Sequence, residues 1–321
     1  MRRYEESDLY EIATNSKPFL TAYAGKEVLI SGATGFVGSW LSAFLDFANR
    51  NFLTDFKLTY VARTIPAEFR NLYPGNKFLE GDVSTMSFPS GYFPDCLINA
   101  ATPSVPKRGG EDSRQILNAS INGTESLLRI CSEDRKPLFI NLSSGIVTKR
   151  GYDTSLDLSL PKNAYLHGKR VSEELITRAT KDGKVKGKNA RLYAFAGPGI
   201  SLTDHFAVGN FVNDALLSRP IAINGNPMTV RSYLYPTDLI INLLRLSEGD
   251  GPNLSEIGSK TKVTMQELAT LINTVTGNVG IEQTTNFGLI DEYAPQVNTL
   301  VSTESVNLTE SISRWINWLK N

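Results

Sequence analysis

The chain has 321 residues, 41% of them hydrophobic, and its 33 lysines and arginines balance 33 aspartates and glutamates. This length predicts one large α/β domain or two unequal ones, and a formal net charge of zero excludes a broad electrostatic attraction to nucleic acid or to an anionic membrane surface. Two cysteines and two histidines exclude a disulfide framework and argue against a zinc or other His-based metal centre.

The first 24 residues predict a short helical extension, because Leu9, Ile12 and Ala13 have helical spacing. Two arginines near the start are followed by acidic residues and by no apolar run, which is unlike a secretory signal. No stretch of the chain approaches the ~20 apolar residues that span a bilayer. We therefore expect a cytoplasmic protein with no membrane partner.

Strands and helices alternate over the next part of the chain. Buried strands are predicted at residues 26–31, 58–62, 96–101 and 138–142, and helices at residues 36–48 and 116–131. This alternation favours an α/β fold in which a doubly wound parallel sheet is covered by helices on both faces.

After residue 196 the predicted elements become shorter and are interrupted by glycine and proline. We therefore expect residues 25–196 to form a cofactor domain and residues 197–321 a smaller α/β substrate-binding domain, with part of residues 229–262 returning to the first domain. Residues 264–276 predict a helix with Thr264 as N-cap and Glu267 at the capping-box spacing. Residues 309–319 predict a closing helix.

A glycine-rich turn joins the first predicted strand to the first long helix. Its glycines, Gly32, Gly35 and Gly38, would permit a tight turn, a close approach to a pyrophosphate and close packing of helix on strand. The helix N-terminus would present backbone N–H groups to the phosphates. The turn therefore predicts a dinucleotide site formed by Gly32, Thr34, Gly35, Phe36, Val37 and Gly38; the alternative is that the glycines serve only the turn.

The second predicted strand is followed by Arg63 and has no acidic residue close by. An acid at this place would bind the ribose of NAD, whereas a guanidinium can pair with the 2′-phosphate of NADP. The sequence thus favours NADP over NAD, unless Arg63 is only a solvated residue at a strand end. Asp82 and Val83, after a third strand, are candidates for the adenine site, although Asp82 could equally cap a turn.

Tyr165 and Lys169 form a YxxxK motif on a predicted helix, where the i, i+4 spacing places both side chains on one face. A lysine beside a tyrosine favours the phenolate and would lower the pKa of Tyr165, making it a general acid/base. Ser144, at the end of the strand at 138–142, could hydrogen-bond the reacting oxygen of a substrate. The alternative for Tyr165 is a buried packing residue.

These motifs together resemble the extended short-chain dehydrogenase/reductases, the NAD-dependent epimerase/dehydratase group that acts on nucleotide sugars. The matching segments lie in family order over about residues 25–260: GATGFVG, GDV, INAAT, INGT, NLSSGIV, YLHGK, RLYAFAGPG and RSYLYPTDL. The resemblance implies a Rossmann-type domain, a smaller C-terminal substrate domain and a homodimer packed through the helices that contain residues 116–131 and 164–180.

The resemblance also implies roles for individual residues. Ser144 would be the catalytic hydroxyl, Tyr165 the acid/base, and Lys169 the residue that binds the nicotinamide ribose and tunes Tyr165. Residues expected beside the cofactor are Ala100, Ala101 and Thr102, and residues expected at the substrate are Ser144, His205, Asn210 and Arg231. Arg231 could instead be a surface salt-bridge residue, and His205 a loop histidine.

Two departures from the family pattern narrow the reaction. Gly145 and Ile146 follow Ser144, where dehydratases of the family carry an Asp-Glu pair and sugar-acid decarboxylases a glutamate. Neither residue can move a proton, so dehydration and decarboxylation become less favoured. We expect a 4-ketoreductase of a nucleotide-activated hexose, with a 4-epimerase that keeps its cofactor tightly bound as the alternative and an NADP redox sensor as the non-enzymatic one.

Overall fold

The computed structural model describes residues 3–102, 112–148, 157–204, 206–248, 253–283, 290–296 and 304–321. The chain divides into two compact units. Unit 1 consists of Met1–Arg191 and Ile240–Ser255, and unit 2 of Leu192–Leu239 and Glu256–Asn321.

A seven-stranded sheet forms the centre of unit 1, with strand order β10-β6-β5-β4-β1-β2-β3. Its strands are β1 (Glu27–Ser31), β2 (Lys57–Ala62), β3 (Lys77–Glu80), β4 (Cys96–Asn99), β5 (Leu138–Ser144), β6 (Lys186–Leu192) and β10 (Leu254–Ile257). All neighbours from β3 to β5 pair in parallel. The strand order reverses between β1 and β4, which is the switch point where ligands bind in doubly wound sheets. The predicted Rossmann-type sheet is therefore confirmed.

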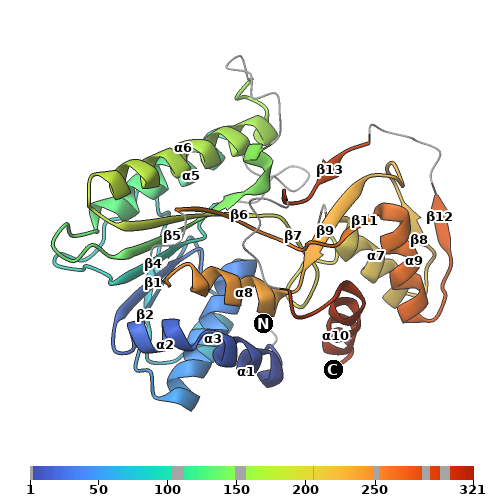
Figure 1. Cartoon of the computed structure of the whole chain (residues 1–321), viewed down its shortest axis with the longest axis horizontal. Helices are drawn as coiled ribbons and strands as arrows, with labels where there is room; N and C mark the ends of the chain where they lie inside the picture. Colours follow the sequence, from blue (N-terminus) through green and yellow to red (C-terminus); the bar gives the residue numbers. More distant parts are fainter. Residues whose placement is uncertain are drawn as a thin grey trace. The chain divides into compact units, whose positions relative to one another are not determined.

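Helices cover both faces of this sheet (Figure 1). One face carries α3 (Phe36–Phe52) with the N-terminal helices α1 (Glu6–Asn15) and α2 (Lys17–Tyr23), and the other carries α5 (Ser113–Arg129) and α6 (Pro161–Lys181). The short helices α4 (Ala67–Leu72) and η1 (Gly145–Thr148) follow β2 and β5, and α8 (Pro236–Arg245) crosses the division between the units.

Apolar side chains hold these layers together. Leu29, Leu97 and Phe139, from three neighbouring strands, are fully buried in one cluster with Leu127 of α5 and Ile176 of α6. A buried Leu or Phe contributes about 1.5–3 kcal/mol relative to an exposed one. The cluster thus fixes α5 and α6 against the sheet, and α6 carries the YxxxK motif.

The N-terminal segment is fastened to α3 by aromatic contacts. The ring of Tyr4 stacks on Trp40 with 3.9 Å between centroids, and Tyr10 meets Phe47 edge-on at 4.8 Å. Such aromatic pairs contribute about 0.5–1.5 kcal/mol beyond the area they bury. The helices of this segment are therefore part of the packed unit 1.

Unit 2 contains short strands and helices around a core of its own. Its elements are β7 (Ala194–Phe195), α7 (Ala207–Leu216), β8 (Ile221–Ile223), β9 (Val230–Leu234), β11 (Lys262–Thr264), α9 (Met265–Thr276), β12 (Ile281–Gln283), β13 (Glu292–Tyr293) and α10 (Leu308–Lys320). Leu268 and Ile272 of α9 pack with Ile312 and Trp315 of α10. Thr264 and Glu267 form the predicted capping box at the start of α9.

Several element bounds differ from the sequence prediction, among them those of α3, β4, β5 and α5, which spans Ser113–Arg129 in place of the predicted 116–131. Helix α3 continues to Phe52, four residues beyond the predicted end at 48. β4 ends at Asn99, two residues before the predicted end at 101, as the chain turns past β1. β5 continues through Ser144, because its two terminal serines are buried and hydrogen-bonded and so can remain in the sheet.

Candidate functional site

The glycine turn after β1 lies against the end of β4. Gly32 has a φ of +72°, and a Cβ at this position would overlap the carbonyl oxygen of Ala100. A Cβ on Gly38 would overlap the Gly32 carbonyl oxygen and the Ala33 backbone. Only glycine fits these two places, because Gly32 combines a left-handed conformation with close backbone contact and Gly38 has close backbone contact alone. The turn, β4 and the start of α3 therefore meet at the switch point of the sheet.

The first turn of α3 fits an anionic group. Its N-cap is Gly35, no side chain caps the helix, and no acidic residue lies in the first turn. The positive end of the helix dipole and its N–H groups thus lie beside the turn without an acidic or capping side chain of their own. The residues at this place, from Thr34 to Gly38, fit the pyrophosphate of a dinucleotide.

The other predicted cofactor residues lie at neighbouring strand ends. Ala100, Ala101 and Thr102 directly follow β4 and are half-buried; the Ala100 amide donates to the Ser31 carbonyl at 3.0 Å. Arg63 directly follows β2, where it is exposed. These positions line the carboxyl edge of β1, β2 and β4, and their contact with a cofactor stays a prediction.

Asp82 and Val83 have structural roles in unit 1. Asp82 Oδ1 accepts from the Ser84 amide at 2.8 Å and from the Ser84 hydroxyl at 2.6 Å, so Asp82 caps the turn after β3. Val83 is buried in the core cluster, and its side chain packs closely against Gly123 of α5. Turn capping was the alternative for Asp82, and the adenine contact stays a prediction.

Ser144, Tyr165 and Lys169 lie together in unit 1. Ser144 is the last residue of β5 and shares a side-chain hydrogen bond with Tyr165 of α6. The Ile146 amide donates to Ser144 Oγ at 3.3 Å. The Lys169 Nζ atom lies 5.7 Å from the centroid of the Tyr165 ring and donates to the Leu142 carbonyl at 2.5 Å. A hydroxyl, a phenol and an amine, each able to exchange a proton, thus converge at the end of β5.

Burial is the largest influence on the pKa values of Tyr165 and Lys169. It raises the pKa of Tyr165, and the hydrogen bond with Ser144 opposes that rise. Burial also lowers the pKa of Lys169 to about 7, while the charge of Glu173 opposes the change. The expected lowering of the Tyr165 pKa by Lys169 is therefore not found, because desolvation of the phenol is the larger effect.

A chain of buried polar side chains crosses the sheet next to this site and was not foreseen. Ser31 donates to Asn99 at 2.8 Å, Asn99 donates to Asn141 at 3.2 Å, and Asn141 donates to Asn189 at 2.9 Å. These residues lie on β1, β4, β5 and β6, which are adjacent strands. Their hydrogen bonds offset the cost of burying amides in the sheet. The recurrence of a polar residue, serine or asparagine, in each of these strands was the available signal.

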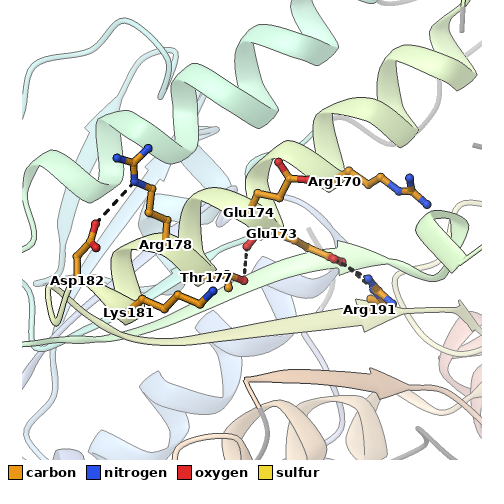
Figure 2. A pocket seen from close by; sticks show the side chains of 8 residues that line it. All are labelled: Arg170, Glu173, Glu174, Thr177, Arg178, Lys181, Asp182 and Arg191. Atoms are coloured by element: carbon orange, nitrogen blue, oxygen red, sulfur yellow. Dashed lines mark hydrogen bonds and ion pairs between the residues drawn. The ribbon is translucent and has the colours of Figure 1, made fainter. Parts of the chain in front are cut away.

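The sequence analysis also predicted no role for Glu173 or Arg191. Glu173 lies on α6, one helical turn after Lys169, and forms an ion pair of 2.7 Å with Arg191 of β6. A surface pocket of about 550 Å³ opens beside this pair (Figure 2). Its lining residues are Arg170, Glu173, Glu174, Thr177, Arg178, Lys181, Asp182 and Arg191.

Besides Ser144, which lies in unit 1, two of the predicted substrate residues, Asn210 and Arg231, lie in unit 2. Arg231, on β9, forms an ion pair of 3.1 Å with Asp291 and lies 6.0 Å over the Tyr293 ring. Asn210 lies on α7 and is half-buried. His205 lies outside the described residues. An ion pair was the alternative for Arg231, and the contacts of all three residues with a substrate stay predictions.

Two kinds of feature are absent from the described ranges. No group of three or more His, Cys, Asp or Glu side chains among those residues could hold a metal ion. In the same part of the chain, no helix has the length and apolar character needed to cross a membrane.

Known proteins resemble the chain in sequence and in fold. The model of the "NAD dependent epimerase/dehydratase family" matches residues 28–257. UDP-glucuronic acid decarboxylase 2 of Arabidopsis thaliana is 24% identical over 267 residues, which are 80% of this chain and 59% of that protein. The chain thus spans less than two thirds of the length of this relative.

Solved structures of epimerases share the fold. An epimerase from Methanothermobacter thermautotrophicus superposes with a TM-score of 0.75 at 20% identity, covering 96% of each chain. UDP-glucuronic acid 4-epimerase from Bacillus cereus, in complex with UDP-glucuronic acid and NAD, gives a TM-score of 0.72 at 19% identity and covers 92% of this chain and 99% of its own. At these identities the similarity establishes the fold.

Proposed function

The chain belongs to the NAD dependent epimerase/dehydratase family, as its motifs predicted, and from this premise we propose that it is an NAD-dependent nucleotide-sugar 4-epimerase. The observation that carries the proposal is the convergence of Ser144, Tyr165 and Lys169 at the end of β5. A hydroxyl for orientation, a phenol for proton transfer and an amine nearby are the groups that oxidation and reduction of a sugar alcohol require.

The epimerase now ranks ahead of the ketoreductase that the sequence favoured. Both reactions need the same three side chains, so the site geometry is compatible with either. Two considerations support the epimerase: the family is named for epimerases, and solved structures with this fold carry that name. A 4-ketoreductase is the second candidate.

The role of each residue follows from its position. The glycine turn from Gly32 to Gly38 would hold NAD, which would supply reversible hydride exchange with the sugar carbon. Ser144 would hold the reacting oxygen, and Tyr165 would take its proton on oxidation and return it on reduction. After oxidation, the 4-keto sugar would rotate within the site, so that reduction would occur on its opposite face. Lys169 would bind the nicotinamide ribose and, when charged, stabilise the phenolate of Tyr165.

Dehydration and decarboxylation have less support. Each needs an additional acid or base at the sugar. Gly145 and Ile146, which directly follow Ser144 in η1, have side chains that cannot move a proton. We therefore do not assign the activity of the decarboxylases to this chain, despite their similarity in sequence.

We propose NAD as the cofactor, in place of the NADP that Arg63 suggested. The support comes from the family's description and from the NAD in the Bacillus cereus epimerase complex. Arg63 is exposed, so it can contact an adenine or solvent as readily as a 2′-phosphate.

For the substrate we propose a uridine diphosphate hexose, because the similar proteins are named for UDP sugars. Asn210 and Arg231, with His205, are the proposed substrate contacts beyond Ser144. A homodimer through α5 and α6 and a cytoplasmic location complete the proposal.

One assay separates the candidates. The purified protein is incubated with NAD or NADPH and a panel of UDP-hexoses and 4-keto sugars, while products are identified by NMR and the nicotinamide absorbance is followed. Interconversion of C4 epimers without a net absorbance change supports the epimerase. Stoichiometric consumption of NADPH indicates the ketoreductase, and tight cofactor binding without any product indicates the redox sensor.

A further inference from the structure

Glu173 is a buried acid that the proposed reaction does not use. It lies on α6, four residues after Lys169 and eight after Tyr165, so the three side chains follow one side of the helix. Its residue exposure is 8%, whereas the neighbouring Glu174 is exposed. Acidic residues are rarely buried unless they are paired, so its partners indicate its role.

Three donors hold the Glu173 carboxylate. Oε1 accepts from the Ser143 hydroxyl at 2.5 Å and from Arg191 Nε at 2.9 Å, and Oε2 accepts from Arg191 Nη2 at 2.7 Å. Figure 2 shows Glu173 pointing from α6 towards Arg191 on β6. A bidentate arginine pair fixes the orientation of a carboxylate as well as its charge. Glu173 is thus held in one position between α6, β5 and β6.

These bonds fasten the catalytic end of β5 to α6. Leu142, Ser143 and Ser144 are consecutive residues of that strand. Lys169 binds the Leu142 carbonyl, Glu173 binds the Ser143 hydroxyl, and Tyr165 shares a hydrogen bond with Ser144. Three residues at four-residue spacing on one helix therefore hold three successive residues of one strand.

The charge of Glu173 also acts on Lys169. It is the charged group that opposes the lowering of the Lys169 pKa by burial. Within the described ranges, Lys169 also faces the Tyr165 ring on α6 and the Leu142 carbonyl on β5. The buried residues of α5, which packs against α6, are Ser113, Ile116, Ser120, Gly123, Thr124, Ser126 and Leu127, and none of them is charged.

We propose that Glu173 is a positioning residue: by binding Ser143 and Arg191 it holds the end of β5 against α6, and it places a negative charge one helical turn from Lys169. The inference rests on the proposed function, since it assigns to Glu173 the alignment of Ser144 and the charge state of Lys169. Arg191, which lines the pocket shown in Figure 2, orients the Glu173 carboxylate.

The test compares Glu173→Gln with Glu174→Gln. Both substitutions remove one negative charge from neighbouring positions of α6, but Glu174 is exposed and outside the site. In the epimerase assay, we expect Glu173→Gln to reduce kcat by roughly tenfold or more, with a smaller change in KM, and Glu174→Gln to leave both near the wild-type values. Ser143→Ala keeps the charge and should reduce kcat without changing the titration of Lys169.

A second readout does not depend on turnover. NMR titration of isotope-labelled lysines, with Lys169→Met to assign the signal, reports the pKa of Lys169 in the protein without substrate. Loss of the Glu173 charge should lower this pKa by about one unit, because the charged amine then lacks its nearby anion. Thermal unfolding of each variant shows whether the fold has survived.

The outcomes distinguish this inference from the proposed function. If no nucleotide sugar is turned over but the Lys169 titration shifts only in Glu173→Gln, the proposed reaction fails and the electrostatic role of Glu173 stands. If Glu173→Gln is folded, matches Glu174→Gln in kcat and leaves the Lys169 titration unchanged, the assignment of Glu173 as a positioning residue is wrong.

Discussion

The Lys169 ammonium nitrogen lies 5.7 Å from the centroid of the Tyr165 ring. The two side chains are therefore neighbours on α6, although burial raises the pKa of Tyr165 and the hydrogen bond with Ser144 opposes that rise. Lys169 is meanwhile anchored to the Leu142 carbonyl of β5. The proposed proton-transfer residue and the proposed ribose-binding residue are therefore held by the same strand end, which also carries Ser144.

Substitution of Tyr165 by Phe should abolish epimerisation and leave the fold intact. The variant loses the only hydroxyl proposed to move the proton, and general acid/base catalysis contributes roughly 100- to 10,000-fold. Calorimetry with NAD should give a dissociation constant close to that of the wild-type protein. Full activity in this variant would show that the catalytic assignment is wrong.

The buried amine of Lys169 should make the stability of the protein depend on pH. Burial lowers its pKa to about 7 in the folded chain, whereas a lysine exposed in the unfolded chain keeps the ordinary value of 10.5. Between these two pH values the unfolded chain therefore binds more protons than the folded one. Stability should therefore rise as pH increases through this window and be lower below it. Urea unfolding near pH 7 and about two units higher measures the change.

The control for this prediction is Lys169→Met, which keeps the length of the side chain and removes the titrating group. Groups remote from Lys169 titrate alike in both proteins, so the pH dependence of the difference in unfolding free energy reports Lys169 and the groups beside it. An equal pH dependence in wild type and variant would contradict the predicted role of burial.

Gly32→Ala should weaken NAD binding and destabilise the protein, because the new methyl group would overlap the Ala100 carbonyl oxygen. Gly25→Ala is the matched control. Gly25 has a φ of +71°, close to the +72° of Gly32, but nothing lies within 4 Å of its Cβ position. The control should cost about 1–2 kcal/mol for the left-handed backbone alone.

The difference between these two alanine variants measures the close approach of the turn to β4. Chemical denaturation gives the unfolding free energies, and titration with NAD gives the affinity. Equal losses of unfolding free energy in Gly32→Ala and Gly25→Ala would mean that the turn can move away from Ala100 with little loss of stability.

Arg63→Ala should test the choice of cofactor. If NAD is the cofactor, the wild-type protein should bind NAD more tightly than NADP, and the substitution should change NAD affinity by less than roughly threefold, as expected for an exposed side chain. Titration with both dinucleotides measures the four affinities. Tighter binding of NADP by the wild type, lost in the variant, would restore the preference that the sequence first suggested.

The sheet and the site differed in how far they could be predicted from sequence. The β1–turn–α3 segment was predicted from its glycines, since only glycine permits the conformation and the contacts of Gly32 and Gly38. The capping box of Thr264 and Glu267 was predicted because its two hydrogen bonds are local. Ser144, Tyr165 and Lys169 were placed together through the motif, and the structure brings them together.

Long-range and electrostatic features could not be predicted in the same way. Glu173 lies at helical spacing from Lys169, but nothing in the sequence shows that Arg191 and Ser143 bind it. The direction in which the pKa of Tyr165 shifts depends on the balance between burial and the hydrogen bond with Ser144, and both are properties of the folded chain. Asp82 illustrates the same limit, because one carboxylate can cap a turn or bind a ligand.

The absence of a Cβ at Gly32 links two segments that are distant in the sequence. The turn after β1 fits only against the backbone at Ala100, which follows β4. Because the contact is with backbone atoms, residue exchanges at Ala100 leave it in place, whereas any side chain at position 32 would meet it. In directed evolution, libraries that randomise position 32 will therefore consist largely of variants with a distorted turn, while the end of β4 can be varied with the turn retained.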